Sequence, residues 1–440
     1  MKIIFVIAFV CLLNACTTHE NKFGETEITK WAHGKKGAIS LTYDDGSINQ
    51  FRQALPIMNR LKLPATFFII TGHIPGSQYQ GKFIGRPVKE IIAETATTPT
   101  NQANFFERAS AVGFLGYEGT VEYHTRAGSL FEAGKMEEAY KTIDEGYQKV
   151  RKGEIKPGQT NKNEVAESED LTWDDIRKYA AQGHEFASHT VTHPRLAVLD
   201  EANLLYELEK SKEDILKQLG PASTFSAEGP YGTEDERVMS YAHKIYPALR
   251  NRMPEPFLEE LNRSSKIQPG TAGKEYVQWQ RGALSKTPMD LMKSWVDTVA
   301  AHDNIWLVLV FHGVDGIGWE AISHEVLDEY FQYIKKQENE LWVATFADAT
   351  KYMRERMNAK VALTEQTNKL LVNLTHSLDK TMYTVPLTLK TYVPDNWNTA
   401  QVKQGETEQT VSVQKDAKGS YILYQATPNA QPVEVAEAQG

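Results

Sequence analysis

Residues 38–46 (AISLTYDDG) form a short apolar segment that ends in two adjacent carboxylates and a glycine. The apolar residues alternate with smaller ones, as in a strand that enters a hydrophobic core. Asp44 and Asp45 therefore stand at the carboxyl end of the predicted strand, where the loops of a parallel α/β fold converge on one pocket. Because Asp-Asp-Gly is also common in solvated turns, this segment alone does not separate a site from a turn.

Two later apolar segments end in histidines. Residues 184–188 lead into His189 and His193, whose spacing of four predicts two imidazoles on one side of a helical turn. The apolar run 306–311 ends at His312, which taken alone would be a core histidine bonded to backbone. One aspartate and two histidines form a metal ligand set that leaves positions for water, and the remaining aspartate and histidine are available as base and acid.

These residues, in this order, resemble the motifs of the NodB-type polysaccharide deacetylases, carbohydrate esterase family 4. Residues 42–46 (TYDDG) are similar to the first motif, and residues 189–193 (HTVTH) match the second, His-Ser/Thr-x-x-His, in full. Residues 230–232 (PYG) match part of the third motif, Arg-x-Pro-Tyr/Phe-Gly, and residues 310–312 (VFH) match the fifth with Val for Leu. The resemblance covers roughly residues 36–355.

The resemblance implies a metal-dependent hydrolase that removes acetyl groups from a poly- or oligosaccharide, with N-acetyl hexosamine units favoured. Asp44 would be the catalytic base and His312 the catalytic acid. Asp45, His189 and His193 would hold one divalent metal. Zinc is expected for two histidines and an aspartate, with cobalt and nickel as alternatives.

Around this core, the third motif departs from the family pattern. The backbone N–H of Tyr231, next to Pro230, would help hold the oxyanion by the same resemblance. Glu228 stands where the family has an arginine that orients the catalytic carboxylate, and an acid there tends to raise the pKa of a neighbouring carboxyl group. We expect Arg281, on the predicted strand 276–284, to replace that arginine.

The fourth motif, an aspartate with a tryptophan that supports the catalytic histidine, has no clear counterpart. Trp279 and Trp319 are the candidates for this support. Two other functions therefore stay open: an O-deacetylase such as an acetylxylan esterase, and a non-catalytic glycan-binding lipoprotein. The formal net charge of -9 argues against nucleic acid or anionic polymers as partners. No protein partner can be inferred.

The N-terminus predicts export. Residues 1–16 read as a lipoprotein signal peptide, with an apolar core and a final LNAC that resembles a lipobox in which Cys16 is lipidated. Ordinary signal cleavage is the alternative. We expect an exported bacterial cell-envelope lipoprotein, in the periplasm or outer membrane, anchored through Cys16, with residues 17–36 as a polar tether. The other cysteine, Cys11, lies in the signal, so the mature chain has no disulfide.

Alternating strand and helix patterns predict an α/β domain over residues 37–358, and about seven strands fit the distorted (β/α)7-type barrel that the resemblance implies. A long insertion, about residues 73–170, separates the first two motifs and contains a predicted helix at 130–150. Its aromatic residues either stack on sugar rings or form a core of their own. His124 either reaches the active site or, as the favoured alternative, lies at the surface.

From residue 360 the pattern becomes that of short antiparallel strands. Residues 360–428 predict a small all-β, Ig-like sandwich, and residues 429–440 a flexible tail. Trp397 suggests a carbohydrate-binding face, but without an aromatic row beside it a structural spacer is the favoured role.

Overall fold

The structure is a computed structural model that describes residues 23–158, 171–366 and 369–438. The predicted signal peptide and Cys16 lie outside these ranges. Within them, no helix is both long enough and apolar enough to cross a membrane. The chain divides into two compact units: Lys30–Asn358 with Leu378–Val385, and the remaining residues before and after them. Residues 378–385, which we predicted in the sandwich, thus belong to the larger unit.

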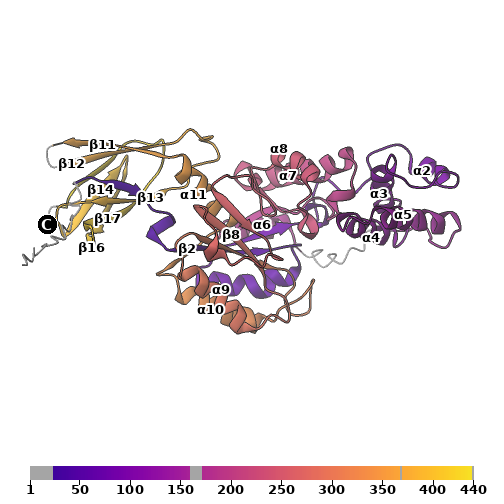
Figure 1. Cartoon of the computed structure of the whole chain (residues 1–440), viewed down its shortest axis with the longest axis horizontal. Helices are drawn as coiled ribbons and strands as arrows, with labels where there is room; N and C mark the ends of the chain where they lie inside the picture. The colour runs from indigo at the N-terminus through magenta and orange to yellow at the C-terminus, as the bar shows by residue number, and fades with distance from the viewer. Residues whose placement is uncertain (1–22, 159–170, 367–368, 439–440) are drawn as a thin grey trace, which may run out of the picture. The chain divides into compact units, whose positions relative to one another are not determined.

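The larger unit is built on a nine-stranded sheet in which every strand pair is parallel (Figure 1). Its order is β6-β5-β4-β3-β2-β9-β8-β7, with β10 beside the start of β2. The strands are β2 (Gly37–Tyr43), β3 (Ala65–Ile69), β4 (Glu185–Ser188), β5 (Ser226–Ala227), β6 (Ala248–Leu249), β7 (Leu258–Leu261), β8 (Tyr276–Gly282), β9 (Ile305–Phe311) and β10 (Leu341–Val343). Because the edge strands β6 and β7 do not pair with each other, the barrel is open. The predicted α/β barrel fold is confirmed.

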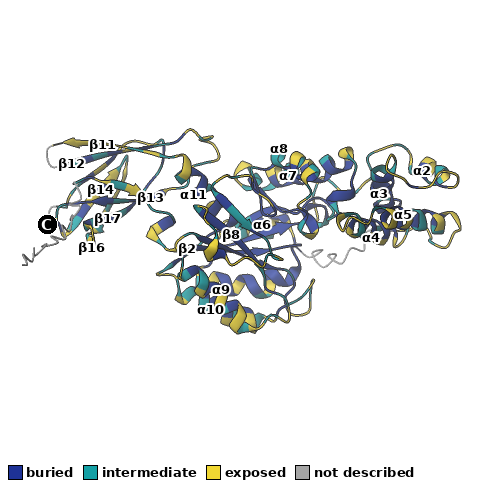
Figure 2. Ribbon diagram, in the orientation of Figure 1, coloured by how far each residue is buried: buried dark blue, intermediate teal, exposed yellow. Residues whose placement is uncertain are grey.

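Helices alternate with these strands, as the sequence pattern predicts. They are α1 (Leu55–Leu61), α6 (Trp173–Ala180), α7 (Glu201–Leu219), α8 (Glu236–Ile245), α9 (Met289–Ala300), α10 (His324–Lys336) and α11 (Phe346–Asn358). A capping box begins α6: the N–H of Asp175 donates to Oγ1 of Thr172, and the Asp175 carboxylate accepts the N–H of Thr172. All residues of β2 and β9 are buried, so the apolar runs form the centre of the core (Figure 2).

The described part of the insertion, residues 73–158, contains four α-helices. They gather at one end of the larger unit (Figure 1). They are α2 (Val88–Glu94), α3 (Phe105–Gly113), α4 (Thr120–Glu132) and α5 (Met136–Arg151), so the single helix predicted at 130–150 is in fact α5 with α4 before it. Phe105, Tyr123 and Tyr147 are buried in a separate hydrophobic cluster with residues from all four helices. The aromatic residues of the insertion therefore form a core of their own, which is the second of the two alternatives.

The smaller unit consists of two antiparallel sheets, as predicted. One has the order β1-β13-β17-β16 and the other β11-β12-β18-β14-β15. The strands are β1 (Thr26–Ile28), β11 (Lys360–Gln366), β12 (Lys369–Thr375), β13 (Leu387–Tyr392), β14 (Thr399–Gln404), β15 (Thr407–Ser412), β16 (Gln414–Asp416), β17 (Gly419–Ala426) and β18 (Val433–Glu437). Trp397 is buried and packs edge-to-face on Phe23, so it does not form an exposed carbohydrate-binding face.

Two predictions, for residues 17–36 and for residues 429–440, are wrong. Strand β1 pairs with β13, and Trp31 is fully buried, so the described part of residues 17–36 is not a free tether. Strand β18 lies between β12 and β14 with Val433 and Val435 fully buried, so residues 429–440 are not simply a flexible tail. Both segments are ordered because each completes the hydrogen bonding of a sheet.

Candidate active site

The sheet places the site residues at one rim, in two groups of strands whose ends are in register. Tyr43 of β2 pairs with Phe311 of β9, Ile69 of β3 with Ser188 of β4, Ser188 with Ala227 of β5, and Ala227 with Leu249 of β6. The residue that follows each strand therefore emerges at the same carboxyl rim, which is where parallel α/β folds build their sites. These following residues are Asp44, His189, Glu228, Arg250 and His312.

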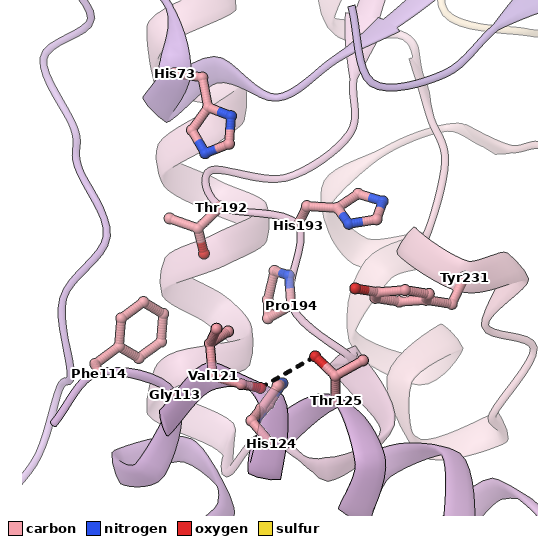
Figure 3. Close-up of a pocket in the computed structure, with 10 residues that line it drawn as sticks. All are labelled: His73, Gly113, Phe114, Val121, His124, Thr125, Thr192, His193, Pro194 and Tyr231. Carbon is pink, nitrogen blue, oxygen red and sulfur yellow. Dashed lines mark hydrogen bonds between the residues drawn. The ribbon is translucent and has the colours of Figure 1, made fainter. Parts of the chain in front are cut away.

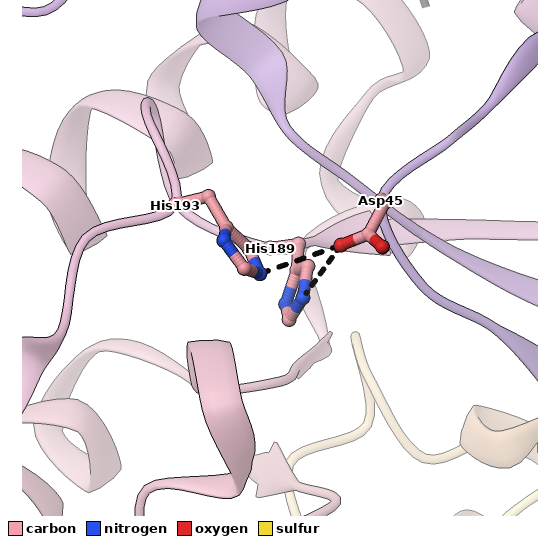
Figure 4. Close-up of side chains that lie close together, drawn as sticks. All are labelled: Asp45, His189 and His193. Atoms are coloured by element: carbon pink, nitrogen blue, oxygen red, sulfur yellow. Dashed lines mark ion pairs between the residues drawn. The ribbon is translucent and has the colours of Figure 1, made fainter. Parts of the chain in front are cut away.

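Asp45, His189 and His193 form a compact cluster (Figure 4). Oδ1 of Asp45 lies 3.6 Å from Nε2 of His189 and 3.3 Å from Nε2 of His193. The Nδ1–H of His189 donates to the backbone oxygen of Glu228 at 3.0 Å, so in a neutral ring Nε2 presents its lone pair. Burial lowers the pKa of His189 to about 4 and keeps the ring neutral. Electron pairs rather than protons thus converge here, an arrangement that fits a cation.

The loop that carries both histidines is not helical, contrary to the prediction. Thr190 and His193 have φ values of 70° and 62°, in the left-handed region that non-glycine residues seldom adopt. The N–H of His193 donates to Oγ1 of Thr190 at 3.0 Å and closes the loop. The two imidazole centroids come within 4.7 Å by this tight turn and not by a helical period. Asp45 is also left-handed, with φ at 75°, so backbone strain gathers at this site.

Glu207, which the sequence reasoning missed, holds this loop from α7. Its Oε2 accepts the N–H groups of Val191 and Thr192, each at 2.9 Å, and its Oε1 accepts the hydroxyl of Thr192 at 2.7 Å. The carboxyl group is 1% exposed, and burial raises its pKa to about 7. A buried side chain with three partners on one loop fixes the position of that loop.

The insertion supports the same loop from its other end. His124 of α4 is buried, not at the surface as predicted; its Nδ1 bonds to the oxygen of Ala109 at 2.8 Å, and its Nε2 accepts the N–H of Arg195 at 3.0 Å. Arg195 in turn pairs with Glu132 at the end of α4. Figure 3 shows His124 and His193 around a small cavity of about 20 Å³. The sequence separates α4 from the loop by about 70 positions, so only the fold reveals this contact.

Asp44 is buried and paired with an arginine that the sequence analysis did not identify. Nη1 and Nη2 of Arg250 reach Oδ1 and Oδ2 of Asp44 at 2.8 and 2.6 Å. The same guanidinium binds Glu228, through Nε at 3.0 Å and Nη2 at 2.8 Å. Burial alone would raise the pKa of Asp44, but the charge and hydrogen bonds of Arg250 outweigh it and hold the pKa well below its usual range. Glu228 therefore holds Arg250 in place, and Arg250 takes the role expected of an arginine at position 228.

Arg281 does not reach Asp44, so its predicted role is wrong. Its guanidinium stacks on Trp279 with 4.5 Å to the ring centroid and donates to the backbone oxygens of Gln280 and Ser265. Trp279 is buried in the hydrophobic core of the barrel. Neither residue is part of the lining of the cavity described below. Arg281 lies on β8, whereas the arginine that orients Asp44 follows β6.

His312 stands beside Asp44, with 3.4 Å between its Nε2 and Oδ2 of the carboxylate. Its backbone oxygen and that of Asp44 both accept hydrogen bonds from Nε2 of Gln50, at 2.9 and 2.5 Å, which ties the two strand ends together. The ring packs edge-on against Trp319 with centroids 4.6 Å apart. Burial lowers the pKa of His312 to about 4, and its Nδ1 has no hydrogen-bond partner among the described residues. No described residue thus gives His312 the hydrogen bond that the aspartate of a fourth motif would supply.

Tyr231 closes the site on the side of His193. Its φ of 62° is left-handed, and its ring lies 4.7 Å from the His193 ring and 4.1 Å from the guanidinium carbon of Arg195. Pro230, in contrast, is buried, and its oxygen accepts the hydroxyl of Thr233 at 2.9 Å. A cavity of about 290 Å³ connects these groups. Its lining includes Asp44, Asp45, His189, His193, His312, Tyr231 and Trp319.

One family model and several known proteins are similar to parts of this chain. The family model described as polysaccharide deacetylase matches residues 32–100 and 130–267, somewhat less than half of the chain. The match supports a polysaccharide deacetylase domain in this part of the protein. A relative named gellan lyase, from a Bacillus species, is 26% identical over an alignment of 279 residues, which covers 59% of this chain and 11% of that protein.

Solved structures that are similar to this chain are distant in sequence. A putative polysaccharide deacetylase from Mycobacterium smegmatis is 12% identical, with 79% of this chain and 100% of that chain covered and a TM-score of 0.36. A family 4 carbohydrate esterase from Bacillus anthracis is 15% identical, with 75% and 86% covered and a TM-score of 0.33.

Proposed function

We propose that this protein is a metal-dependent deacetylase of an acetylated poly- or oligosaccharide, with N-acetylated hexosamine units as the favoured substrate. The observation that carries the proposal is the environment of Asp44. This carboxylate is kept ionised by Arg250, faces Nε2 of His312, and adjoins the Asp45/His189/His193 cluster in one cavity. An ionised base, an imidazole and a cation site together provide what metal-dependent acetyl hydrolysis uses: a proton acceptor, a proton donor and a Lewis acid.

The cluster of Asp45, His189 and His193 would hold the metal. Its donor set, one carboxylate oxygen and two imidazole nitrogens, suits zinc, and the hydrogen bond from His189 to the backbone oxygen of Glu228 orients one of the ligands. A divalent cation bound there would supply Lewis acidity, which lowers the pKa of water and polarises the acetyl carbonyl.

The side chains of this chain account for the proton transfers. Asp44 accepts a proton from the attacking water as the new C–O bond forms. Because Nε2 of His312 lies 3.4 Å from Oδ2, that proton can pass to the neutral imidazole. His312 then delivers it to the sugar nitrogen or oxygen as the acetyl bond breaks and acetate leaves. The N–H of Tyr231, at the edge of the cavity, is the proposed donor to the oxyanion.

Of the two alternative functions, the structure gives the glycan-binding one less support than the sequence did. Glu228 suggested a disabled site, but the arginine that it appeared to replace is provided by Arg250. The O-deacetylase uses the same groups, since ester and amide differ only in the atom that receives the proton from His312.

To test the proposal, a protein that consists of residues 23–440 is incubated with a panel of N-acetylated and O-acetylated glycans, with and without a chelator. The acetate released from each glycan is measured. We expect release that the chelator abolishes and zinc restores. The substrates that respond decide between amide and ester cleavage. No acetate from any substrate, with one equivalent of metal bound, would contradict the proposal and favour a glycan-binding protein.

We also propose that the chain is a cell-envelope lipoprotein anchored through Cys16, on the basis of the LNAC sequence alone. In a bacterial host, the full-length protein should fractionate with membranes, and Cys16→Ala should move it to the soluble fraction. An unchanged membrane association of this variant would contradict the anchor.

A further inference from the structure

Arg263 is a cation in the active-site cavity that the proposed mechanism does not use. It follows β7 at the carboxyl rim and is half-buried. It lines the cavity together with His312 and Trp319. It also lines a neighbouring recess of about 580 Å³, which begins at Tyr231. Arg263 therefore stands where the catalytic cavity opens into space for further sugar units.

The other two arginines near the cavity are already engaged. Arg250 is shared by Asp44 and Glu228, and Arg195 pairs with Glu132 and covers the Tyr231 ring. Within residues 23–158, 171–366 and 369–438, Arg263 forms no ion pair and no side-chain hydrogen bond. A half-buried guanidinium without an anion has lost part of its hydration and gained no partner, so an anionic ligand would supply the missing hydrogen bonds.

The acidic residues that line the recess do not supply the missing anion, since each has another partner. Glu132 pairs with Arg195, Glu234 accepts the side-chain amide of Asn262, and Asp235 caps α8 by accepting the N–H of Val238 at 2.9 Å.

The local backbone leaves room for the guanidinium. At Gly232, whose φ is 72°, a Cβ atom would lie 3.0 Å from Nη2 of Arg263, so a side chain at this position would crowd it. Trp319 lines the same cavity and leaves 50% of its surface exposed. The exposed indole offers an apolar face to a sugar ring, while Arg263 offers a planar pair of N–H donors to an anion.

We propose that Arg263 binds the carboxylate of a uronic acid unit, so that the substrate is an acetylated acidic glycan. This inference rests on the proposed deacetylase function and adds the substrate class. A guanidinium matches a carboxylate with two parallel hydrogen bonds, which gives geometric selectivity as well as attraction. The net charge of -9 pointed away from anionic polymers as partners. Recognition depends, however, on the charge inside the cavity, where Arg263 is a cation with no ion-pair partner among the described residues.

The test compares substrates that differ only in charge. Acetate release is measured on oligosaccharides of alternating N-acetylglucosamine and glucuronate, on O-acetylated oligogalacturonate, and on the methyl esters of both. For the wild type, kcat/KM should be about 10- to 100-fold higher for the free acid than for its methyl ester, which is the range of a charge-assisted hydrogen-bond pair. In Arg263→Met the ratio should fall to about one, with part of it retained in Arg263→Lys.

Lys266→Met is the matched control, because Lys266 is an exposed cation in the same loop and should leave the ratio at the wild-type value. A ratio near one in the wild type, or an unchanged ratio in Arg263→Met, would overturn the inference while acetate release still supports the deacetylase. Absence of acetate from every glycan would overturn the proposed function itself. If Arg263→Met fails to fold, the wild-type ratio should fall in about 0.5 M salt, as screening predicts, and a salt-independent ratio would overturn the inference.

Discussion

The guanidinium of Arg250 binds both carboxylate oxygens of Asp44, at 2.8 and 2.6 Å, and the pair is almost completely buried. This contact joins the ends of β6 and β2 across the sheet. It explains how Asp44 stays ionised although Glu228 occupies the position where an arginine is expected. The role of Arg250 is the first point that mutagenesis can test.

Arg250→Met should lower acetate release at least about 100-fold and destabilise the fold. Loss of the cation leaves Asp44 and Glu228 as buried carboxyl groups without their shared partner, a change that typically costs about 3–5 kcal/mol. Urea unfolding and acetate release measure the two effects. Arg281→Met is the matched control, since Arg281 makes its contacts with Trp279 and two backbone oxygens. Equal loss of activity in both variants would restore the role that the sequence suggested for Arg281.

Glu207→Gln should weaken metal binding about 10-fold or more, the usual effect of removing a group that orients a metal ligand. The amide can replace one acceptor oxygen but not both, so the loop before His193 loses at least one of its three hydrogen bonds. Competition with a zinc chelator gives the affinity. Glu209→Gln, an exposed position two residues along α7, serves as the control. Indistinguishable affinities for the two variants would show that Glu207 does not position the site.

Stability should fall on acidification from about pH 6.5 towards about pH 4. Burial lowers the pKa of His184 to about 4, while its Nδ1 accepts the N–H of Ala65 at 3.2 Å. Between these pH values the unfolded chain binds a proton at His184 and the folded protein does not, so stability is complete above the unfolded pKa and is lost below it. At about pH 5, His184 alone lowers the free energy of unfolding by about 2 kcal/mol. The free energy of unfolding is measured with urea at neutral pH and at about pH 5. His184→Gln should reduce the difference between these two free energies by the same amount. An unchanged difference would contradict the assignment.

His124→Ala should raise KM or weaken metal binding while the free energy of unfolding changes little. The reason is that His124 acts through the loop that carries His193. Its removal takes away the acceptor for the Arg195 N–H and the bond to Ala109. We expect a loss of metal affinity of about 10-fold, as for other groups that support a ligand. His124→Gln, which can accept the N–H of Arg195, should recover part of it. A stability loss with unchanged metal affinity would indicate a purely structural role.

The sequence predicted the strand ends well wherever a long apolar run is followed by a charged or imidazole side chain, as at Asp44 and His312. It did not reveal Arg250, because β6 has two residues and no recognisable period. The positions of β1 and β18 were missed for a related reason: each gains its order from a partner strand far away in the sequence. Glu207 looks like an ordinary residue of an amphipathic helix until the loop that it binds is known.

The spacing of His189 and His193 correctly predicted that the two imidazoles lie close together, but it predicted the wrong backbone conformation. Four residues bring two imidazoles together on a helix, but here Thr190 and His193 adopt left-handed conformations that no residue pattern in this loop indicates. Such conformations persist only where the surroundings impose them, and here Glu207 and the insertion do so. The local pattern therefore identified the two candidate ligands, and tertiary contacts determine how they lie.

The most direct test of the account is acetate release by Asp44→Asn, with its metal content measured on the same sample. The amide side chain of this variant cannot accept a proton, whereas Asp45, His189 and His193 are untouched. We expect one equivalent of bound metal and a rate at least about 1,000-fold below wild type, the size of a general base's contribution. Acetate release at the wild-type rate would contradict the assignment of Asp44 as the base on which the proposed function depends.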